Sequence, residues 1–324
     1  MSNGNTKSKR VAMNPKVSII MATYNRAHFI AETLLSIQKQ TFVDWECLIV
    51  DDGGTDHTSE VISAILDQDK RFSFIKRPER YLKGLPGCRN YGLDLAKGDY
   101  IIFFDDDDIP HPQNLELCVL ELQDPTISFC RYIRNVFFED FHYAFDYSKE
   151  YTSFYIDKKD IHKMLNNELQ FNSCAVMWRA ACFEKNRFEE TLMYAEEWEL
   201  YSRIVSSGIR GISIEKCLFY GRKHLNSNTG EFYSNNPVRR ESYANAILLV
   251  VQNIKEKQLL TYSLKRYFIA FSLDFEEYNL FEKILNILKL TTFEKIKWQI
   301  FYKILPFRLI IHRRKKALKK RFNF

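Results

Sequence analysis

The chain has 324 residues, of which 46% are hydrophobic and 27% charged, so it can bury a full core and has the composition of a globular protein. Its seven cysteines are scattered and include no Cys-x-x-Cys pair, which argues against a zinc site or a disulfide framework. No uncharged apolar run reaches about 18 residues, and the first ten residues are polar, so we expect a cytoplasmic protein. The net charge of +6 comes largely from a basic run at 313–321.

Short apolar runs alternate with amphipathic helical patterns from Lys16 to Pro110, which predicts a parallel α/β sheet flanked by helices. We expect strands over 17–22, 47–50, 72–75 and 100–104, and helices over 27–39 and 58–66. A Gly/Pro loop over 84–87 precedes a third helix that runs to Lys97. Asn25 is the predicted N-cap of the first helix, and Gly98 the stop of the third.

The pattern becomes mixed after Asp124 and purely helical after Asn236. We expect strands over 127–137, 175–178 and 218–223, and helices over 160–166, 196–206, 241–255 and 260–273. The predicted divisions are a disordered polar tail over 1–14, a main domain over 15–232 and a helical C-terminal region over 233–324.

Four carboxylates, Asp105 to Asp108, follow the apolar run Tyr100–Phe104 and are closed by Ile109-Pro110. They therefore lie at the carboxyl end of a predicted strand, where open α/β sheets bind ligands. Asp oxygens suit Mg²⁺ or Mn²⁺, and such ions are commonly shared with substrate phosphates. The alternative is a solvated acidic turn.

Five motifs occur in an order that resembles family 2 glycosyltransferases with the GT-A fold. The motifs are VSIIMATYNR from Val17, LIVDDGGTD from Leu48, RNYG from Arg89, AKGDY from Ala96 and FDDDD from Phe104. The resemblance is close over about 15–112 and looser to about residue 228. It implies an α/β fold with a Rossmann-like mixed sheet flanked by helices, a nucleotide-binding part over 15–112, an acceptor-binding part over 113–232, and a helical C-terminal extension.

The resemblance also implies a site for a nucleobase, usually uracil. Ala22, Tyr24 and Asp52 would contact it, with Tyr24 offering a ring face and Asp52, rather than Asp51, accepting from a base N–H. The alternative is that Tyr24 packs over the first helix and the two aspartates only form a turn with Gly53.

For the diphosphate, the resemblance makes Asp107 the metal ligand, with Mn²⁺ or Mg²⁺ as the cofactor. Asp105 and Asp106 would meet the ribose or metal-bound water, although four consecutive Asp leave the register open, Asp108 included. Arg89 would lie near the donor phosphates, or else be an exposed helical arginine. His224 would approach the metal or the diphosphate, or else be structural.

The run AEEWEL from Ala195 resembles the family's Glu-Asp motif at a helix start, which supplies the general base. Glu197 stands where the family usually has Asp, so either Glu197 or Glu196 is the expected base. The alternative is that these glutamates only stabilise the helix by placing negative charge at the positive end of its dipole.

The resemblance implies a metal-dependent inverting glycosyltransferase of the hexosyl type. It would move a sugar, expected from UDP, to a hydroxyl of a glycan or lipid-linked acceptor in bacterial surface polysaccharide synthesis. The alternatives are a nucleotidyltransferase and a catalytically inactive sugar-nucleotide-binding or scaffold protein.

The last stretch, 296–324, mixes aromatic and aliphatic residues with the basic run. Such a segment predicts peripheral contact with an anionic membrane, here the inner face of the plasma membrane. A merely solvated helix and RNA binding are the alternatives; we favour the membrane and expect no nucleic-acid partner.

Overall fold

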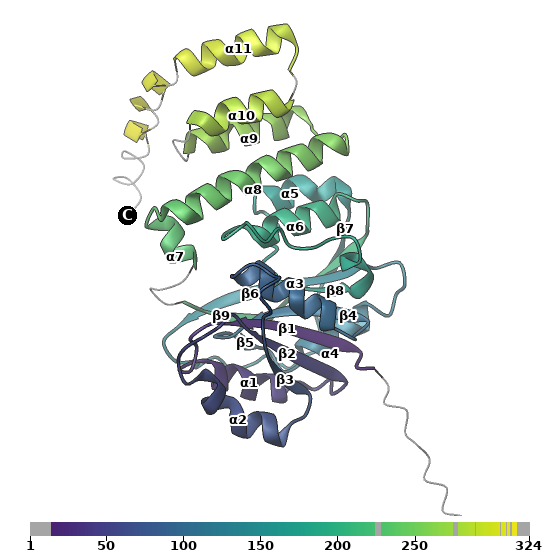
Figure 1. The fold of residues 1–324 in the computed structure, drawn as a ribbon. Helices are drawn as coiled ribbons and strands as arrows, with labels where there is room; N and C mark the ends of the chain where they lie inside the picture. Colours follow the sequence, from purple (N-terminus) through teal and green to yellow (C-terminus); the bar gives the residue numbers. More distant parts are fainter. Residues whose placement is uncertain are drawn as a thin grey trace, which may run out of the picture. The chain divides into compact units, whose positions relative to one another are not determined.

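The protein is described from a computed structural model, which covers residues 14–223, 228–274, 278–288, 290–304, 306–308, 310–311 and 313–315. Contacts within the chain divide it into two compact units, and the division falls between Arg240 and Glu241 of the sequence. Figure 1 labels the helices and strands of both units. The first unit contains the sheet, and the second contains only helices among its described residues. The predicted division after residue 232 stays a prediction.

The N-terminal part of the first unit forms the predicted parallel sheet. Its strands pair in the order β3-β2-β1-β4, all parallel. The strands are β1 (Val17–Thr23), β2 (Trp45–Asp51), β3 (Phe72–Lys76) and β4 (Tyr100–Asp105), and the connecting helices are α1 (Ile30–Gln38), α2 (Thr58–Gln68) and α3 (Leu85–Leu95).

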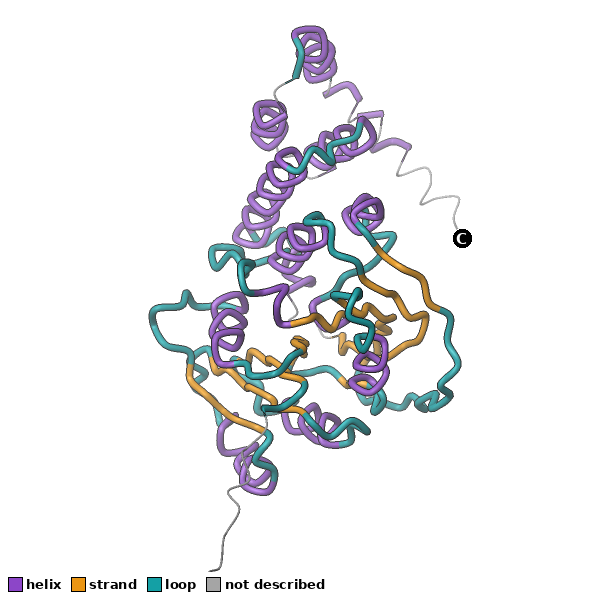
Figure 2. The backbone as a smooth tube through the Cα atoms, turned by 90° about the vertical axis from the view of Figure 1, so that its right-hand side faces the viewer, coloured by secondary structure: helices purple, strands orange, loops and turns teal. Residues whose placement is uncertain are grey.

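Helices cover both faces of this sheet, which is why β1 is apolar along nearly its whole length and buried at every residue (Figure 2). Ile19 and Met21 point into the core formed with α1, whereas Ala22 packs with Cys88 of α3. A Cβ added at Gly92 of α3 would lie 2.4 Å from the Ile20 Cγ2 atom. Glycine therefore lets α3 approach β1 closely.

The sheet continues beyond β4 as a mixed sheet, as the GT-A resemblance implies. Next to β4 comes β8, antiparallel to β4 and to β6, and β6 runs parallel to β9. These strands are β6 (Phe129–Phe138), β8 (Val176–Arg179) and β9 (Gly211–Lys223). Two short strands, β5 (Ile109–Pro110) and β7 (Ser153–Ile156), pair antiparallel with β9 and were not predicted.

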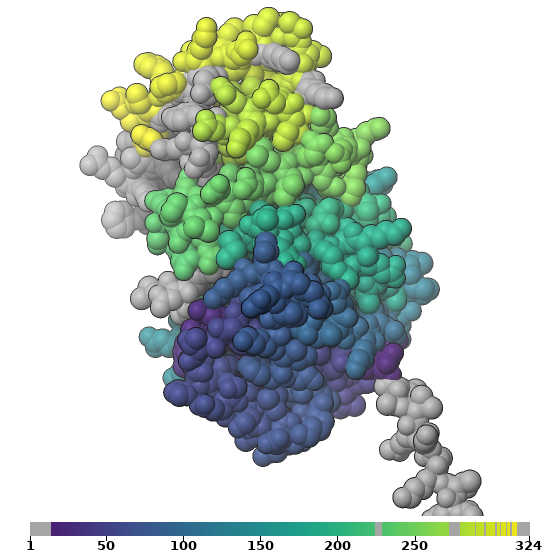
Figure 3. Space-filling view, in the orientation of Figure 1, coloured from purple at the N-terminus to yellow at the C-terminus, as the bar shows by residue number. Residues whose placement is uncertain are grey.

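The first unit contains further helices after β4. They are α4 (Asn114–Glu121), α5 (Ile161–Leu165), α6 (Glu196–Val205), α7 (Asn228–Tyr233) and the first residues of α8 (Pro237–Glu256), with short 3₁₀ turns at 158–160, 173–175 and 180–183. Figure 3 shows the surface of the molecule in the orientation of Figure 1.

The second unit consists of the rest of α8 followed by α9 (Tyr262–Asp274), α10 (Tyr278–Leu288) and α11 (Thr292–Lys303). Helices were predicted over 241–255 and 260–273, close to the observed α8 and α9. None of the helices in the described ranges combines the length and apolar character needed to cross a bilayer.

One local prediction is wrong. Asn25 does not cap the first helix, which begins at Ile30. Asn25 has a left-handed backbone (φ 54°), and its side-chain oxygen accepts hydrogen bonds from the N–H groups of Thr55 (2.7 Å) and Asp56 (3.3 Å). This residue therefore joins the loop after β1 to the loop after β2, and both loops belong to the candidate site.

Candidate active site

The register of the parallel strands brings the predicted donor residues to one edge of the sheet. Ala22 of β1 lies opposite Val50 of β2 on one side and opposite Asp105 of β4 on the other. The segments that carry Tyr24 and Asp52, and the acidic run from Asp105, therefore all begin at the same carboxyl edge. This convergence is what the sequence predicted.

The two aspartates after β2 have different partners. The Asp51 side chain accepts a hydrogen bond from the Gly54 N–H (2.9 Å) and so forms the local turn. Asp52 is buried and accepts from the Arg77 Nε atom (2.5 Å). Tyr24 is 44% exposed, and the Lys83 ammonium lies 4.5 Å from its ring centroid.

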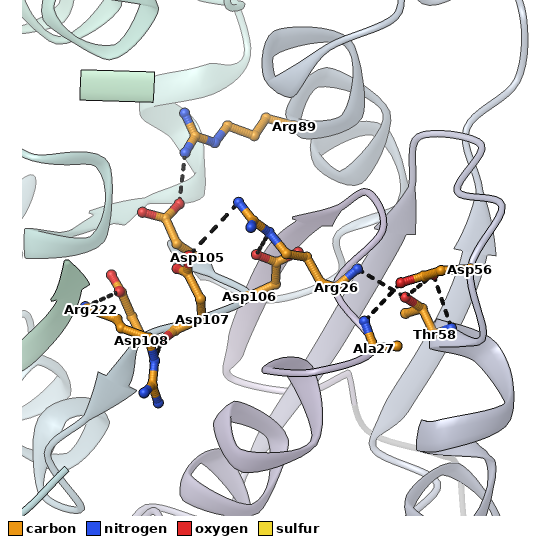
Figure 4. Close-up of polar contacts among 10 residues, drawn as sticks. All are labelled: Arg26, Ala27, Asp56, Thr58, Arg89, Asp105, Asp106, Asp107, Asp108 and Arg222. Atoms are coloured by element: carbon orange, nitrogen blue, oxygen red, sulfur yellow. Dashed lines mark hydrogen bonds and ion pairs between the residues drawn. The ribbon is translucent and has the colours of Figure 1, made fainter. Parts of the chain in front are cut away.

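The loop between β1 and α1 is held in place by Asp56 (Figure 4). Its carboxylate accepts hydrogen bonds from the Ala27 N–H (3.0 Å) and from the N–H (3.1 Å) and hydroxyl (2.5 Å) of Thr58. These bonds hold the pKa of Asp56 below its usual value, although burial opposes them. The same loop carries Tyr24 and Arg26.

The four consecutive aspartates differ sharply in exposure. The Asp105 side chain is 35% exposed, whereas those of Asp106, Asp107 and Asp108 are 8%, 11% and 2% exposed. Arg26 lies beside the middle pair, 3.3 Å from Asp106 and 3.8 Å from Asp107 (Figure 4). The alternative of a solvated acidic turn does not fit this burial.

Two arginines from the mixed part of the sheet complete the surroundings of this run. The Arg222 backbone N–H donates to the Asp108 carboxylate (2.7 Å), and its Nε donates to the Asp107 carbonyl (3.0 Å). The guanidinium of Arg134 lies 3.5 Å from Asp108. Asp108 is thus occupied by structural partners, while Asp105 faces the more open side.

Burial and mutual repulsion disfavour full ionisation of the acidic run. Burial is the main cause that raises the pKa of Asp106 to about 7; Asp107 adds to it, and Arg26 opposes it. Burial and the Asp105 charge likewise raise the pKa of Asp108 well above its ordinary value. A cation bound here would relieve this cost.

The residues fit a hard divalent cation only in part. Among the described residues, ligand atoms of Asp105, Asp108 and Cys174 lie within 4.8 Å of one another. Burial raises the pKa of the Cys174 thiol well above its usual range, and a neutral thiol is a poor ligand for Mg²⁺ or Mn²⁺. The carboxylates of Asp105 and Asp108 are the suitable donors in this group, which does not include Asp107, so Asp107 as the metal ligand stays a prediction. His224 lies outside the described residues.

Arg89 connects the acidic run to the start of α6. It is buried, and its guanidinium contacts Asp105 (3.2 Å) on one side and Glu196 (3.0 Å) on the other. The alternative of an exposed helical arginine is therefore wrong. Its predicted approach to donor phosphates stays a prediction.

The three glutamates in the first turn of α6 have different partners. Glu196 pairs with Arg89, and Glu199 forms two bonds of 2.9 Å to Arg203. No lysine, arginine or histidine in the described part of the chain pairs with Glu197. Burial and the neighbouring Glu196 charge raise the pKa of Glu197 to about 8, although the Arg89 charge opposes them, so the ionised carboxylate is a stronger base than a solvated glutamate and predominates only above about pH 8.

Sequence reasoning assigned no role to four arginines that contact the predicted site residues. These are Arg26, Arg77, Arg134 and Arg222. Of these four, only Arg26 could have been suspected from the sequence, because it is the last residue of the first motif. Arg222 and Asp108 are 114 positions apart, so no local pattern could join them.

Comparison with known proteins gives the family. The model of the family described as Glycosyl transferase family 2 matches residues 18–185, more than half of the chain. An Escherichia coli protein named UDP-Glc:alpha-D-GlcNAc-diphosphoundecaprenol beta-1,3-glucosyltransferase is 37% identical over 113 residues, which cover 35% of this chain and 43% of that protein. The chain spans less than half the length of the curated relatives that it matches first.

Solved structures give the fold. Residues 1–349 of S. aureus TarS in complex with UDP-GlcNAc match with a TM-score of 0.64 at 19% identity, covering 84% of this chain and 79% of that one. The mannosyltransferase PcManGT from Pyrobaculum calidifontis, in complex with GDP-Man and Mn²⁺, matches with a TM-score of 0.53 at 16% identity, covering 92% and 83%. The chain therefore belongs to glycosyltransferase family 2 and has the GT-A fold.

Proposed function

We propose that this protein is an inverting glycosyltransferase that moves a sugar from a UDP-sugar to a hydroxyl of a lipid-linked saccharide. The observation that carries the proposal is the Arg89 bridge, which ties Asp105 of the expected donor site to Glu196, next to the expected base. The E. coli relative, whose name contains UDP-Glc and a diphosphoundecaprenol-linked sugar, supports the choice of donor and acceptor.

In the proposed donor site, the nucleobase stacks on the exposed ring of Tyr24. Ala22 forms the floor beside it, and Asp52 accepts from the base N–H with its orientation fixed by Arg77. Lys83, which lies over the Tyr24 ring, supplies positive charge at the mouth of this site. A TarS structure that contains UDP-GlcNAc supports a uridine donor.

The diphosphate would be held through Mn²⁺ or Mg²⁺ with Asp107 as ligand and Asp105 and Asp106 nearby. When bound, the cation supplies positive charge that stabilises the departing nucleoside diphosphate. The Mn²⁺ in the PcManGT structure supports this choice of cofactor. Removing the cation is expected to weaken donor binding.

Transfer follows as one displacement. Glu197 takes the proton of the acceptor hydroxyl while that oxygen bonds to the anomeric carbon, and the bond from this carbon to the phosphate oxygen breaks. The electron pair leaves with UDP, and the anomeric configuration inverts. Arg89 holds Glu196 in an ion pair and so leaves Glu197 as the carboxylate that reacts.

The setting we propose is bacterial surface polysaccharide synthesis, with the protein in the cytoplasm and peripheral on the inner face of the plasma membrane. A membrane-embedded acceptor requires an enzyme that works at the bilayer surface. The acceptor named for the E. coli relative, a diphosphoundecaprenol-linked sugar, supports this setting.

The test is an incubation of the protein with a UDP-sugar, Mn²⁺ and a set of diphospholipid-linked sugars, followed by analysis of both products. We expect release of UDP and a glycan with inverted anomeric configuration. Release of pyrophosphate would instead indicate a nucleotidyltransferase. Binding of UDP without any product from any acceptor would favour a sugar-nucleotide-binding protein without turnover.

A further inference from the structure

The strongest unexplained feature is a row of large apolar side chains exposed along α11 and the residues that follow it. Each is between 43% and 79% exposed. The row, here called the apolar stripe, consists of Phe293, Ile296, Ile300, Ile304, Phe307 and Ile311. The steps of three and four residues between them are the spacing of one face of a helix, and Phe293, Ile296 and Ile300 lie within α11 itself.

Backbone hydrogen bonds show that the helical path continues past the end of α11. The Ile304 N–H donates to the Ile300 carbonyl (3.2 Å), and the Arg308 N–H donates to the Ile304 carbonyl (3.1 Å). Ile300 and Ile304, two residues of the apolar stripe, are therefore joined by a hydrogen bond of helical spacing.

The apolar stripe is not closed over by the neighbouring helix of the same unit. Ile296 and Ile300 form one wall of an open groove of about 640 Å³, whose other wall comes from α10 residues such as Phe281 and Leu285. Large exposed apolar patches with a polar rim mark interaction surfaces.

Charge indicates the partner. The sequence from Thr292 to Phe324 contains eleven Lys and Arg residues but one acidic residue, Glu294. Several of these cations, including Lys297, Lys303 and Arg308, are exposed beside the apolar stripe. A second copy of the chain would bring an equally basic segment alongside, and like charges would oppose that pairing.

We propose that the apolar stripe lies in the headgroup region of an anionic lipid bilayer, with its apolar side chains in the acyl boundary and its cations on the lipid phosphates. A helix with an apolar face and a basic polar face binds in this way, and its affinity rises with buried apolar area and with anionic lipid. The inference rests on the proposed membrane location and names the surface that makes the contact.

The test is sedimentation of the full-length protein with vesicles of phosphatidylcholine alone or mixed with phosphatidylglycerol. The wild type binds the anionic vesicles more strongly, and added salt weakens this binding. The triple variant Phe293→Ser, Ile300→Ser and Phe307→Ser lowers partitioning more than about tenfold, because three side chains leave the interface.

The matched control is Val43→Ser, Val61→Ser and Leu120→Ser, which removes three other exposed apolar side chains, 43% to 68% exposed, from the first unit. This control binds vesicles as the wild type does. Equal binding by the apolar-stripe variant and the wild type would overturn the proposal, as would a wild type that ignores anionic lipid. The proposal would also be overturned if light scattering showed that the wild type is a dimer and that the apolar-stripe variant is a monomer.

The sedimentation assay involves no sugar transfer, so it separates this inference from the proposed function. Vesicle binding that depends on the apolar stripe, in a protein that binds no UDP, would support the inference and contradict the function. The variants should retain the nucleotide affinity of the wild type, which also shows that they are folded.

Discussion

Glu197 combines two properties that a general base needs. It lies in the first turn of α6, and within the described ranges no lysine, arginine or histidine forms an ion pair with it, although the Arg89 charge partly offsets the rise in its pKa. Burial and the charge of Glu196 make it a stronger base than a solvated glutamate, because they raise its pKa to about 8. Glu196 is held by Arg89 at 3.0 Å and is less available for proton transfer.

Replacing Glu197 with glutamine should separate binding from catalysis. We expect Glu197→Gln to lower the transfer rate at least about a hundredfold, because no group then removes the acceptor proton. UDP affinity should stay within about twofold, since the amide keeps the shape of the side chain. Glu184→Gln, at an exposed glutamate, is the control. Near-normal turnover of Glu197→Gln would refute the assignment.

The pKa of Glu197 also predicts the pH profile of transfer. The neutral carboxyl predominates below about pH 8 and cannot accept a proton, so at saturating donor the rate should rise with pH and level off above about pH 8. Asp106 also titrates in this range, because its pKa is raised to about 7. UDP affinity is therefore measured at each pH, so that a change in donor binding is not mistaken for a change in the transfer rate. A flat rate profile from about pH 6 to about pH 9 would contradict this role.

Because Arg89 contacts both Asp105 and Glu196, we expect it to position them, and its loss should affect stability and catalysis together. Arg89→Met leaves the buried Glu196 without its partner, which typically costs about 3 kcal/mol in the free energy of unfolding. Arg89→Lys should restore part of this stability but little of the transfer rate, because a single ammonium cannot bridge Asp105 and Glu196 as the fork does. Denaturant unfolding and steady-state kinetics measure both.

The control for Arg89 is Lys16→Met, which breaks the exposed pair with Asp99 and should change stability by less than about 0.5 kcal/mol. If Arg89→Met were as stable and as active as Lys16→Met, Arg89 would hold neither carboxylate in the working protein.

At the scale of elements, the close approach of α3 to β1 positions the donor edge. A side chain at Gly92 would collide with Ile20, so Gly92→Val should lower the free energy of unfolding by at least about 2 kcal/mol. Ala64→Val, at an exposed position of α2, controls for the cost of a β-branched residue in a helix. Equal destabilisation by the two changes, measured by denaturant unfolding, would mean that α3 does not press on β1.

The elements that could be predicted are those whose pattern is local. Strands β1 to β4 are apolar runs bounded by turn residues, and their order fixed the edge where Asp52 and Asp105 meet. β5 is only two residues long and ends in proline, and β7 is largely exposed, so neither shows a strand pattern. Both exist because β9 offers them a partner.

The arginine partners of the site carboxylates could not be predicted, because they too depend on contacts between distant parts of the chain. Arg77 reaches Asp52 over 25 positions, and Arg222 reaches Asp108 over 114. The prediction that Asn25 caps the first helix was wrong because asparagine is common both at helix N-caps and in left-handed turns. The contacts of Asn25 with Thr55 and Asp56, which the sequence does not reveal, hold it in the turn.

At the scale of the whole molecule, the described site residues all belong to the first unit, while the apolar stripe belongs to the second. Catalysis and membrane contact are thus assigned to different units, and variants in one should leave the other function intact.

The most direct measurement is calorimetric titration of UDP and GDP into the full-length protein, first with Mn²⁺ and then with a chelator. We expect UDP to bind more tightly than GDP, with the affinity for UDP falling at least about tenfold without metal and in Asp107→Asn. A folded protein that binds neither nucleotide, or that binds UDP equally well with and without metal, would contradict the proposed metal-dependent UDP-sugar site.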